Sequence, residues 1–119
     1  QLLWIGNGGQ NSILHNDQQD NLLVMLRGSK RLVLYDPYQS ALLYEQASLD
    51  RVSPVDIENP DLERHPRFGA AKSTTVVLNA GDMLYLPHHW WHQVYSDQAS
   101  AALNIWFDVY DSKKALEGD

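Results

Sequence analysis

Short runs of β-branched and aromatic residues, separated by turn residues, recur along almost the whole chain and constrain its fold more than any other feature. Runs of this kind predict β-strands. Some of them, such as residues 22–26, are apolar at every position, which is typical of sheets that are covered on both faces, at least in part. The eight expected strands are residues 2–5, 12–16, 21–27, 30–35, 74–78, 82–86, 91–96 and 101–108. An all-β fold follows.

The connections between these strands favour a closed arrangement. Residues 27–30 predict a tight hairpin and residues 79–82 predict a turn, since each contains a glycine beside polar residues. Residues 36–73 form a long insertion between the fourth and fifth strands. Eight antiparallel strands with one long excursion predict a jelly roll, the double-stranded β-helix of cupin barrels.

The insertion carries helix signals of its own. Asp36 is a good N-cap, Pro37 suits the first helical position and Gln39 follows three residues after the cap, so a short helix is expected through about Tyr44. Residues 59–64 predict a second brief turn in the same way. Residues 112–117 are expected to form a final helical turn.

Composition limits the class of protein. The chain has 119 residues, 44% of them hydrophobic and 20% charged, which is typical of one globular domain. It has no cysteine, which excludes disulfides, thiol catalysis and cysteine-bound zinc. No apolar run is long enough to span a bilayer and no signal peptide is visible, so we expect a cytoplasmic or nuclear protein without a membrane partner.

The net charge of −6 and the pI near 5.2 bear on the partner. Nucleic-acid binding draws much of its affinity from neutralised phosphates, which makes it unexpected for an acidic domain. A protein, a peptide or a small molecule is the expected substrate.

His15 and Asp17 lie two residues apart in a segment expected to be extended, where side chains at i and i+2 share one face. His92 lies far along the chain, in another strand-like segment. Two histidines and one carboxylate that leave other positions open are typical of non-haem Fe(II) oxygenases. The residues alone leave two alternatives. The three side chains can be an exposed loop pair and a histidine packed beside tryptophans, or His88 or His89 can compete for the third position.

Six short fragments follow one another along the chain: His15-Asn16-Asp17, Asn21-Leu22-Leu23-Val24, Gly28-Ser29-Lys30, Asn59-Pro60-Asp61-Leu62-Glu63-Arg64, Gly81-Asp82-Met83-Leu84-Tyr85-Leu86-Pro87 and Trp90-Trp91-His92. In this order they resemble the cupin-like JmjC-domain oxygenases that depend on Fe(II) and 2-oxoglutarate. Within that family the fragments are most similar to the asparaginyl-hydroxylase type. The resemblance extends from Leu3 to about Asp108.

The resemblance implies a role for individual residues. It makes His15, Asp17 and His92 the Fe(II) ligands and therefore the catalytic centre. It implies that Lys30 pairs with the distal carboxylate of 2-oxoglutarate, assisted by the hydroxyl of Ser12. The further cosubstrate contacts that it implies are Asn21, Asn104 and Trp106.

Strand periodicity agrees with the role of Lys30. Lys30 shares a strand face with Leu32 and Leu34, which points it toward the barrel interior. A buried lysine without an anion is costly, so an interior Lys30 favours an anionic ligand. Without the resemblance, a lysine beside a hairpin is ordinarily a solvated turn residue.

The resemblance implies an Fe(II)- and 2-oxoglutarate-dependent dioxygenase. It would use O₂ to hydroxylate a side chain of a protein or peptide, with succinate and CO₂ as coproducts. The alternatives are an RNA-modifying hydroxylase, a histone lysine demethylase and a non-catalytic metal-binding cupin. The acidic charge disfavours the first, and the complete set of site residues disfavours the last.

The chain departs from the family at both ends. Family members usually carry a long segment before the first core strand, and many carry helices after the last one, whereas this chain begins with the core at Leu2 and stops shortly after Trp106. Because its first residue is Gln1 rather than methionine, we expect residues 1–119 to be a single domain that is the core fragment of a longer protein. A dimer through C-terminal helices is not expected, so the isolated domain is expected to be a monomer.

Overall fold

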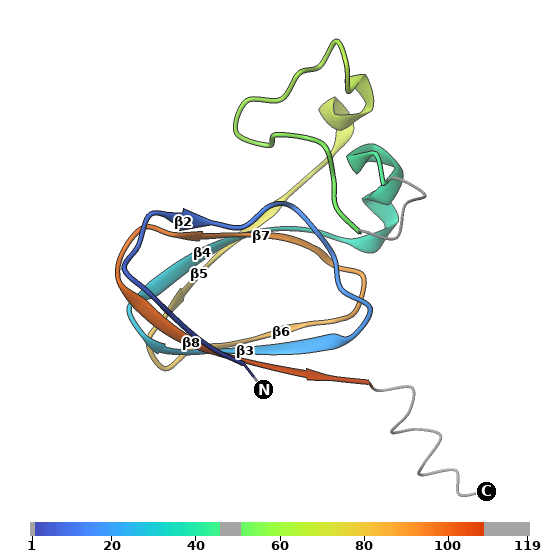
Figure 1. Cartoon of the computed structure of the whole chain (residues 1–119). Coiled ribbons are helices and arrows are strands. Elements are labelled where there is room, and N and C mark those ends of the chain that lie inside the picture. The colour runs from blue at the N-terminus through green and yellow to red at the C-terminus, as the bar shows by residue number, and fades with distance from the viewer. Residues whose placement is uncertain (1, 46–50, 109–119) are drawn as a thin grey trace, which may run out of the picture.

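The computed structural model of the chain describes residues 2–45 and 51–108. Two antiparallel four-stranded sheets face each other and enclose the barrel (Figure 1). The first sheet has the order β1 (Leu2–Gly6), β8 (Ser100–Phe107), β3 (Asp20–Arg27) and β6 (Met83–Leu86). The second has the order β2 (Gln10–Asn11), β7 (Trp91–Ser96), β4 (Ser29–Tyr35) and β5 (Thr74–Asn79). This arrangement confirms the all-β jelly roll that the sequence predicts.

The segment expected as the second strand, residues 12–16, is not a continuous strand. The regular ladder ends after Gln10–Asn11, and His15 forms only isolated bridges, to His92 and to Val52. Side chains take over backbone bonds here: the Ser12 hydroxyl accepts the Val94 N–H at 2.8 Å, and the Ile13 carbonyl lies 2.8 Å from Nδ1 of His15. Local bonds of this kind compete with a β-ladder and interrupt it.

The hairpin expected at residues 27–30 is wrong. β3 and β4 are consecutive in the chain but belong to different sheets, so Gly28 is a corner between sheets. Its φ of 75° is left-handed, and a Cβ at this position would lie 2.5 Å from the Ala99 carbonyl oxygen. A glycine is required because both the backbone angle and the close approach exclude a side chain.

The turn expected at residues 79–82 is confirmed. The Asp82 N–H donates to the Asn79 carbonyl at 2.9 Å, and the Asp82 carboxylate accepts the Asn79 N–H at 2.8 Å. Gly81 takes a φ of 95° in this turn, with no atom within 4 Å of a Cβ built on it.

The insertion begins with the expected helix, which is a 3-10 helix, η1 (Pro37–Leu43). The Asp36 carboxylate caps it by accepting the Tyr38 N–H at 2.9 Å, and Tyr44 ends it in a left-handed conformation. Asp61 caps the second expected turn by accepting the N–H groups of Glu63 and Arg64, each at 3.2 Å.

A further 3-10 helix, η2 (Pro66–Ala70), was not predicted from the sequence. The helical turn expected at residues 112–117 lies outside the described residues. In the part of the chain that the structure describes, no helix has the length and apolar character needed to cross a membrane.

Two apolar clusters hold the layers together. The first fills the space between the sheets: Leu23, Met25, Leu32, Leu34, Leu78, Leu86 and Ala102. The second joins the outer face of the β2–β7–β4–β5 sheet to the insertion: Leu14, Val33, Tyr35, Leu43, Trp91 and Tyr95. Trp91 is fully buried there and donates its indole N–H to the Ser40 hydroxyl at 2.8 Å, whereas Trp90 packs against the first cluster. The insertion therefore covers one end of this sheet from outside (Figure 1).

The outer face of the other sheet is different. Its exposed side chains include Leu3 and Ile5 of β1 and Met83 and Tyr85 of β6. Within residues 2–45 and 51–108 no segment packs over this face in the way that the insertion packs over the other sheet. The two sheets are thus covered unequally.

We expect Gly28→Ala to lower the free energy of unfolding by about 3 kcal/mol, because the new methyl group meets the Ala99 carbonyl in a left-handed backbone. Gly81→Ala is the matched control and should lower the free energy of unfolding by about 1 kcal/mol, since only the left-handed backbone angle disfavours the new side chain. Urea unfolding followed by circular dichroism measures both. Equal losses of unfolding free energy in the two variants would contradict a destabilising contact between a Cβ at position 28 and the Ala99 carbonyl.

Candidate metal centre

His15, Asp17 and His92 come together at one end of the barrel. Each offers one ligand atom, and these atoms all lie within 4.8 Å of one another. The Asp17 carboxylate lies 4.0 Å from Nε2 of His15 and 3.5 Å from Nε2 of His92. The cause is backbone pairing: the His15 N–H donates to the His92 carbonyl at 3.1 Å, and the His92 N–H donates to the His15 carbonyl at 2.8 Å.

Backbone carbonyls orient both imidazoles. Nδ1 of His15 lies 2.8 Å from the Ile13 carbonyl, and Nδ1 of His92 lies 3.0 Å from the Trp90 carbonyl. A carbonyl oxygen only accepts, so in each ring Nδ1 carries the proton and Nε2 keeps its lone pair. Both Nε2 atoms are the ones that face Asp17. Two histidines are therefore preset in the tautomer that binds a metal through Nε2.

Burial adds to this preparation. Only 6% of His92 is exposed, and burial, followed by the nearby His15, lowers the pKa of His92. A lowered pKa keeps the imidazole neutral near pH 7, which metal binding requires. His15 and Asp17 are half-buried, so the cluster is open on one side. Two imidazoles and one carboxylate with open positions suit a catalytic rather than a closed structural site.

An interior cavity of about 410 Å³ leads from this cluster into the barrel. All eight side chains that the sequence singles out line it: Ser12, His15, Asp17, Asn21, Lys30, His92, Asn104 and Trp106. Its remaining walls are mostly apolar, with Leu23, Leu32 and Leu86 among them. These eight side chains come from five segments of the chain, namely residues 12–17 and the strands β3, β4, β7 and β8, and they meet in one space.

Lys30 reaches this cavity from β4 and is not a solvated turn residue. Its ammonium donates to the Ser96 hydroxyl at 2.6 Å, and burial lowers its pKa. Among the described residues, no carboxylate lies within ion-pair distance of it. An ammonium held by a hydroxyl alone in a partly buried cavity favours an anionic ligand.

Asparagines supply the other polar walls. Asn21 and Asn104 are both buried, and they lie on neighbouring strands of the first sheet. The side-chain oxygen of Asn21 is buried and has no hydrogen-bond partner among the residues that the structure describes. Buried polar atoms are rarely left without partners, so this amide is suited to a bound polar group.

A second hollow approaches the cluster from outside. This outer groove, of about 940 Å³, shares His15, Asp17 and Trp106 with the interior cavity. Its rim is polar and includes Gln18, Gln19, Arg51 and His89. The cluster therefore lies where an enclosed chamber meets an open groove, an arrangement that can hold one molecule inside and present another from outside.

His92, rather than His88 or His89, occupies the third position of the cluster. His89 lines the outer groove, as expected for a rim residue, and His88 pairs with the buried Asp20. Sequence reasoning missed Asp20 and Ser96. Ser96 lies four residues after His92 on the same strand, so strand alternation would have placed it on the same face.

Residues 1–113 match the family model described as a cupin-like domain. The chain belongs to the cupin-like domain family. This cupin-like domain is 38% identical over 103 residues to tRNA wybutosine-synthesizing protein 5 of Gallus gallus, with 87% of this chain and 32% of that protein covered. It is 39% identical over 106 residues to lysine-specific demethylase 8 of Danio rerio, with 87% and 26% covered. The expected family is confirmed at this level.

Human HSPB1-associated protein 1 is a third relative, 35% identical over 121 residues, with 95% of this chain and 24% of that protein covered. This domain therefore spans about a quarter to a third of the length of these three curated relatives.

Solved structures show the same fold. Hydroquinone 1,2-dioxygenase from Sphingomonas sp. TTNP3 superposes with a TM-score of 0.57 at 18% identity, covering 87% of this chain and 56% of that chain. The cupin domain of Drosophila melanogaster CENP-C superposes with a TM-score of 0.55 at 12% identity, covering 88% and 58%. At such identities the likeness concerns the fold alone.

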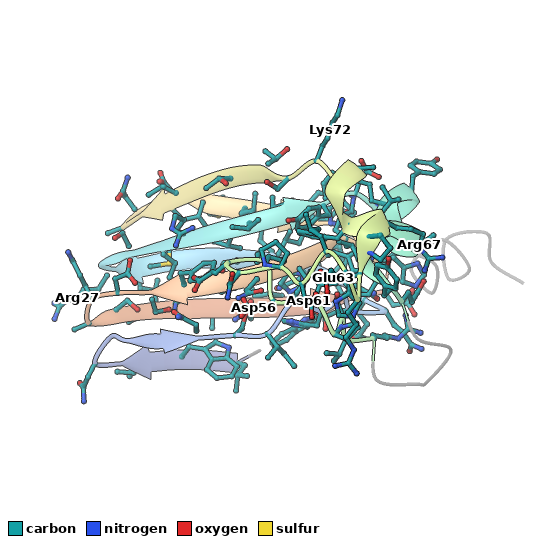
Figure 2. All side chains as sticks on the ribbon, turned by 90° about the horizontal axis from the view of Figure 1, so that it is seen from above. Arg27, Asp56, Asp61, Glu63, Arg67 and Lys72 are labelled. Atoms are coloured by element: carbon teal, nitrogen blue, oxygen red, sulfur yellow. The ribbon has the colours of Figure 1, made fainter. Side chains whose placement is uncertain are left out.

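We expect the domain to bind one divalent ion per chain at the cluster and Asp17→Ala to abolish that binding, because the carboxylate is its only anionic ligand. Titration calorimetry of the metal-free protein with Mn²⁺ measures this. Asp56→Ala, which removes an exposed carboxylate of the insertion (Figure 2), is the matched control and should bind as the unaltered protein does. Unchanged binding by Asp17→Ala would contradict the assignment of the ligands.

Proposed function

We propose that this cupin-like domain is an Fe(II)- and 2-oxoglutarate-dependent dioxygenase that hydroxylates a side chain of a protein or peptide. One observation carries the proposal: the His15–Asp17–His92 cluster and the Lys30 ammonium line the same interior cavity. A metal site and an ammonium that has no carboxylate partner among the described residues line one cavity, and this suits a ligand that both chelates a metal and carries a distant carboxylate.

The donor set fits Fe(II). Two neutral imidazole nitrogens and one carboxylate oxygen, with other positions open, form the facial arrangement that non-haem Fe(II) oxygenases use. The carbonyls of Ile13 and Trp90 hold the two imidazoles in the required tautomer. His15, Asp17 and His92 would therefore hold the ion without rearranging.

The cavity also fits the cosubstrate. A volume of about 410 Å³ lies within the range of small-ligand sites. Lys30 offers a compact ammonium to a carboxylate, and Asn21 offers a buried side-chain oxygen that has no partner within residues 2–45 and 51–108. Ser12, Asn104 and Trp106 line the same space. These residues would bind the distal carboxylate and the body of 2-oxoglutarate.

When bound, Fe(II) and 2-oxoglutarate supply the oxidation of a substrate C–H bond by O₂, with succinate and CO₂ as coproducts. The residues of the chain contribute orientation and shielding. Lys30 would fix the far end of the cosubstrate, and the apolar walls at Leu32 and Leu86 exclude water from the chamber. The outer groove would present the substrate beside Asp17 and Trp106.

Three considerations support a protein or peptide substrate. The domain is acidic, with a net charge of −6, which suits a peptide better than a nucleic acid. The outer groove is open and has glutamine side chains on its rim, which can donate to and accept from a peptide backbone. The motif fragments are most similar to the asparaginyl-hydroxylase type, so side-chain hydroxylation is proposed rather than lysine demethylation.

A second candidate is hydroxylation of RNA. It is favoured by the identity of 38% to a protein named for tRNA wybutosine synthesis. Lysine demethylation is favoured in the same way by the name of the zebrafish relative. Parallel assays with peptide, methyl-lysine peptide and tRNA substrates separate the three.

We expect the purified domain to form succinate slowly from 2-oxoglutarate with Fe(II), ascorbate and O₂, in the absence of a substrate. His92→Ala should abolish this turnover because it removes a buried ligand of the cluster. Succinate is measured by mass spectrometry. The absence of turnover, together with no binding of Fe(II) or 2-oxoglutarate in calorimetry, would favour a non-catalytic cupin.

We expect Lys30→Ala to raise the KM for 2-oxoglutarate at least about tenfold while changing kcat less, because a charge-assisted bond to the cosubstrate is lost. Lys72→Ala is the matched control, since that lysine is exposed and points away from the barrel (Figure 2). Steady-state succinate formation measures both variants. An unchanged KM in Lys30→Ala would refute the role of this lysine.

A further inference from the structure

Asp20 is a buried carboxylate that the metal cluster and the two cavities do not use. It is 2% exposed, it opens β3 three residues after Asp17, and it lines neither the interior cavity nor the outer groove. Its neighbours Asn21 and Leu23 do line the interior cavity. Because successive side chains of a strand alternate, Asp20 lies outside the barrel wall and cannot reach the ligand atoms itself.

Asp20 bonds to His88, which lies in the loop between β6 and β7, residues 87–90. The Asp20 carboxylate accepts the His88 N–H at 2.7 Å, and Nδ1 of His88 lies 3.1 Å from the same oxygen. Burial raises the pKa of Asp20, the two bonds from His88 and a weaker interaction with the Tyr85 hydroxyl lower it, and the net effect is a lowered pKa. The carboxylate is therefore ionised and engaged by the loop.

The next two residues of that loop contact the candidate metal ligands. The His89 N–H donates to the Asp17 carbonyl at 2.8 Å, and the Trp90 carbonyl accepts the bond from Nδ1 of His92 at 3.0 Å. Figure 1 shows this loop beside the segment that leads into β3. Three consecutive loop residues thus connect Asp20, Asp17 and His92.

The loop backbone is strained where it meets Asp17. His89 has a φ of 68°, in the left-handed region that residues other than glycine rarely adopt. Such a conformation persists only where surrounding contacts fix it. The bonds on either side of His89, from the His88 N–H to Asp20 and from Nδ1 of His92 to the Trp90 carbonyl, are contacts of this kind.

We propose that Asp20 is a positioning residue of the metal centre, which fixes the loop of residues 87–90 and through it the orientation of Asp17 and His92. The alternative is a buried pair that stabilises the fold and leaves the cluster unaffected. The proposal rests on the proposed metal centre, so its test measures metal binding directly and uses the unaltered protein as the reference.

Asp20→Ala removes both bonds to His88. We expect it to weaken Co²⁺ binding about tenfold and to alter the visible absorption of the Co²⁺-loaded protein, because the ligands lose their fixed orientation. Asp20→Asn keeps an oxygen that can accept the His88 N–H and should restore most of the affinity and the original spectrum. Calorimetry and absorption spectroscopy measure these effects without reference to turnover.

Gly28→Ala is the control for loss of stability. It disrupts a corner next to Arg27, at the end of the barrel opposite the insertion (Figure 2), and should leave the Co²⁺ affinity and spectrum unchanged. All variants are compared at a temperature at which circular dichroism shows them folded. His88→Ala provides a second variant, which removes the side-chain bond to Asp20 and keeps the backbone bond. The His88 side chain is 56% exposed, so we expect this variant to fold and its Co²⁺ binding to weaken about threefold.

The outcomes are distinct. If the unaltered protein binds no Co²⁺, the metal centre and the role of Asp20 both fail. If it binds Co²⁺ and folded Asp20→Ala has the same affinity and spectrum, the metal centre stands and the positioning role is overturned. Should Asp20→Ala not fold, Asp20→Ser takes its place, since the serine hydroxyl is too short to accept both bonds from His88, and an unchanged affinity and spectrum in that variant overturn the positioning role.

Discussion

Two backbone hydrogen bonds between His15 and His92 are the interaction on which the rest of the site depends. They bring two imidazoles to a ring-centroid separation of 4.3 Å, although the segments that carry them are far apart in the chain. On its other side His15 pairs with Val52 of the insertion. The backbone at His15 is therefore held between β7 and the insertion, and this double support gives a short, irregular segment the rigidity of a strand within a sheet.

Around that pair, several hydrogen bonds join a backbone group to a side chain, whereas a regular ladder joins two backbone groups. The Ser12 hydroxyl, the Ile13 carbonyl and the Trp90 carbonyl each bond a group that a continuous strand would have used differently. A perfect ladder at residues 12–16 would have left the His15 imidazole free to take either tautomer. The interruption of the strand and the orientation of the histidine are linked, because the bond of the Ile13 carbonyl to the His15 ring contributes to both.

Much of the fold could be predicted from local patterns, because alternation of side chains and turn residues are local properties. His92 and Lys30 lie on strands whose inner face the alternation identifies, whereas His15 and Asp17 lie on an irregular segment, and the roles of all four came from the family resemblance. The link at Gly28 was wrongly predicted as a hairpin, because a glycine-containing link has the same sequence pattern whether the next strand joins the same sheet or the opposite one. Distant partners, β8 for β3 and β7 for β4, decide which sheet each strand joins. Asp20 and η2 were missed for a related reason. The burial of Asp20 is created by His88, which no pattern around Asp20 reveals.

The strand order has a consequence for how the polypeptide acquires its structure during synthesis. Among the described strands, β1 pairs with β8 alone, so Leu2 can pair only after Asn104 has been synthesised, and His15 can bond His92 only after that residue has been synthesised. Contacts between segments so distant in sequence carry a large loop-closure cost and slow folding. A nascent chain that has emerged only as far as β5 holds His15, Asp17 and Lys30 without the strands that bring them together. The chamber is therefore assembled late, after the ribosome has delivered almost the whole domain.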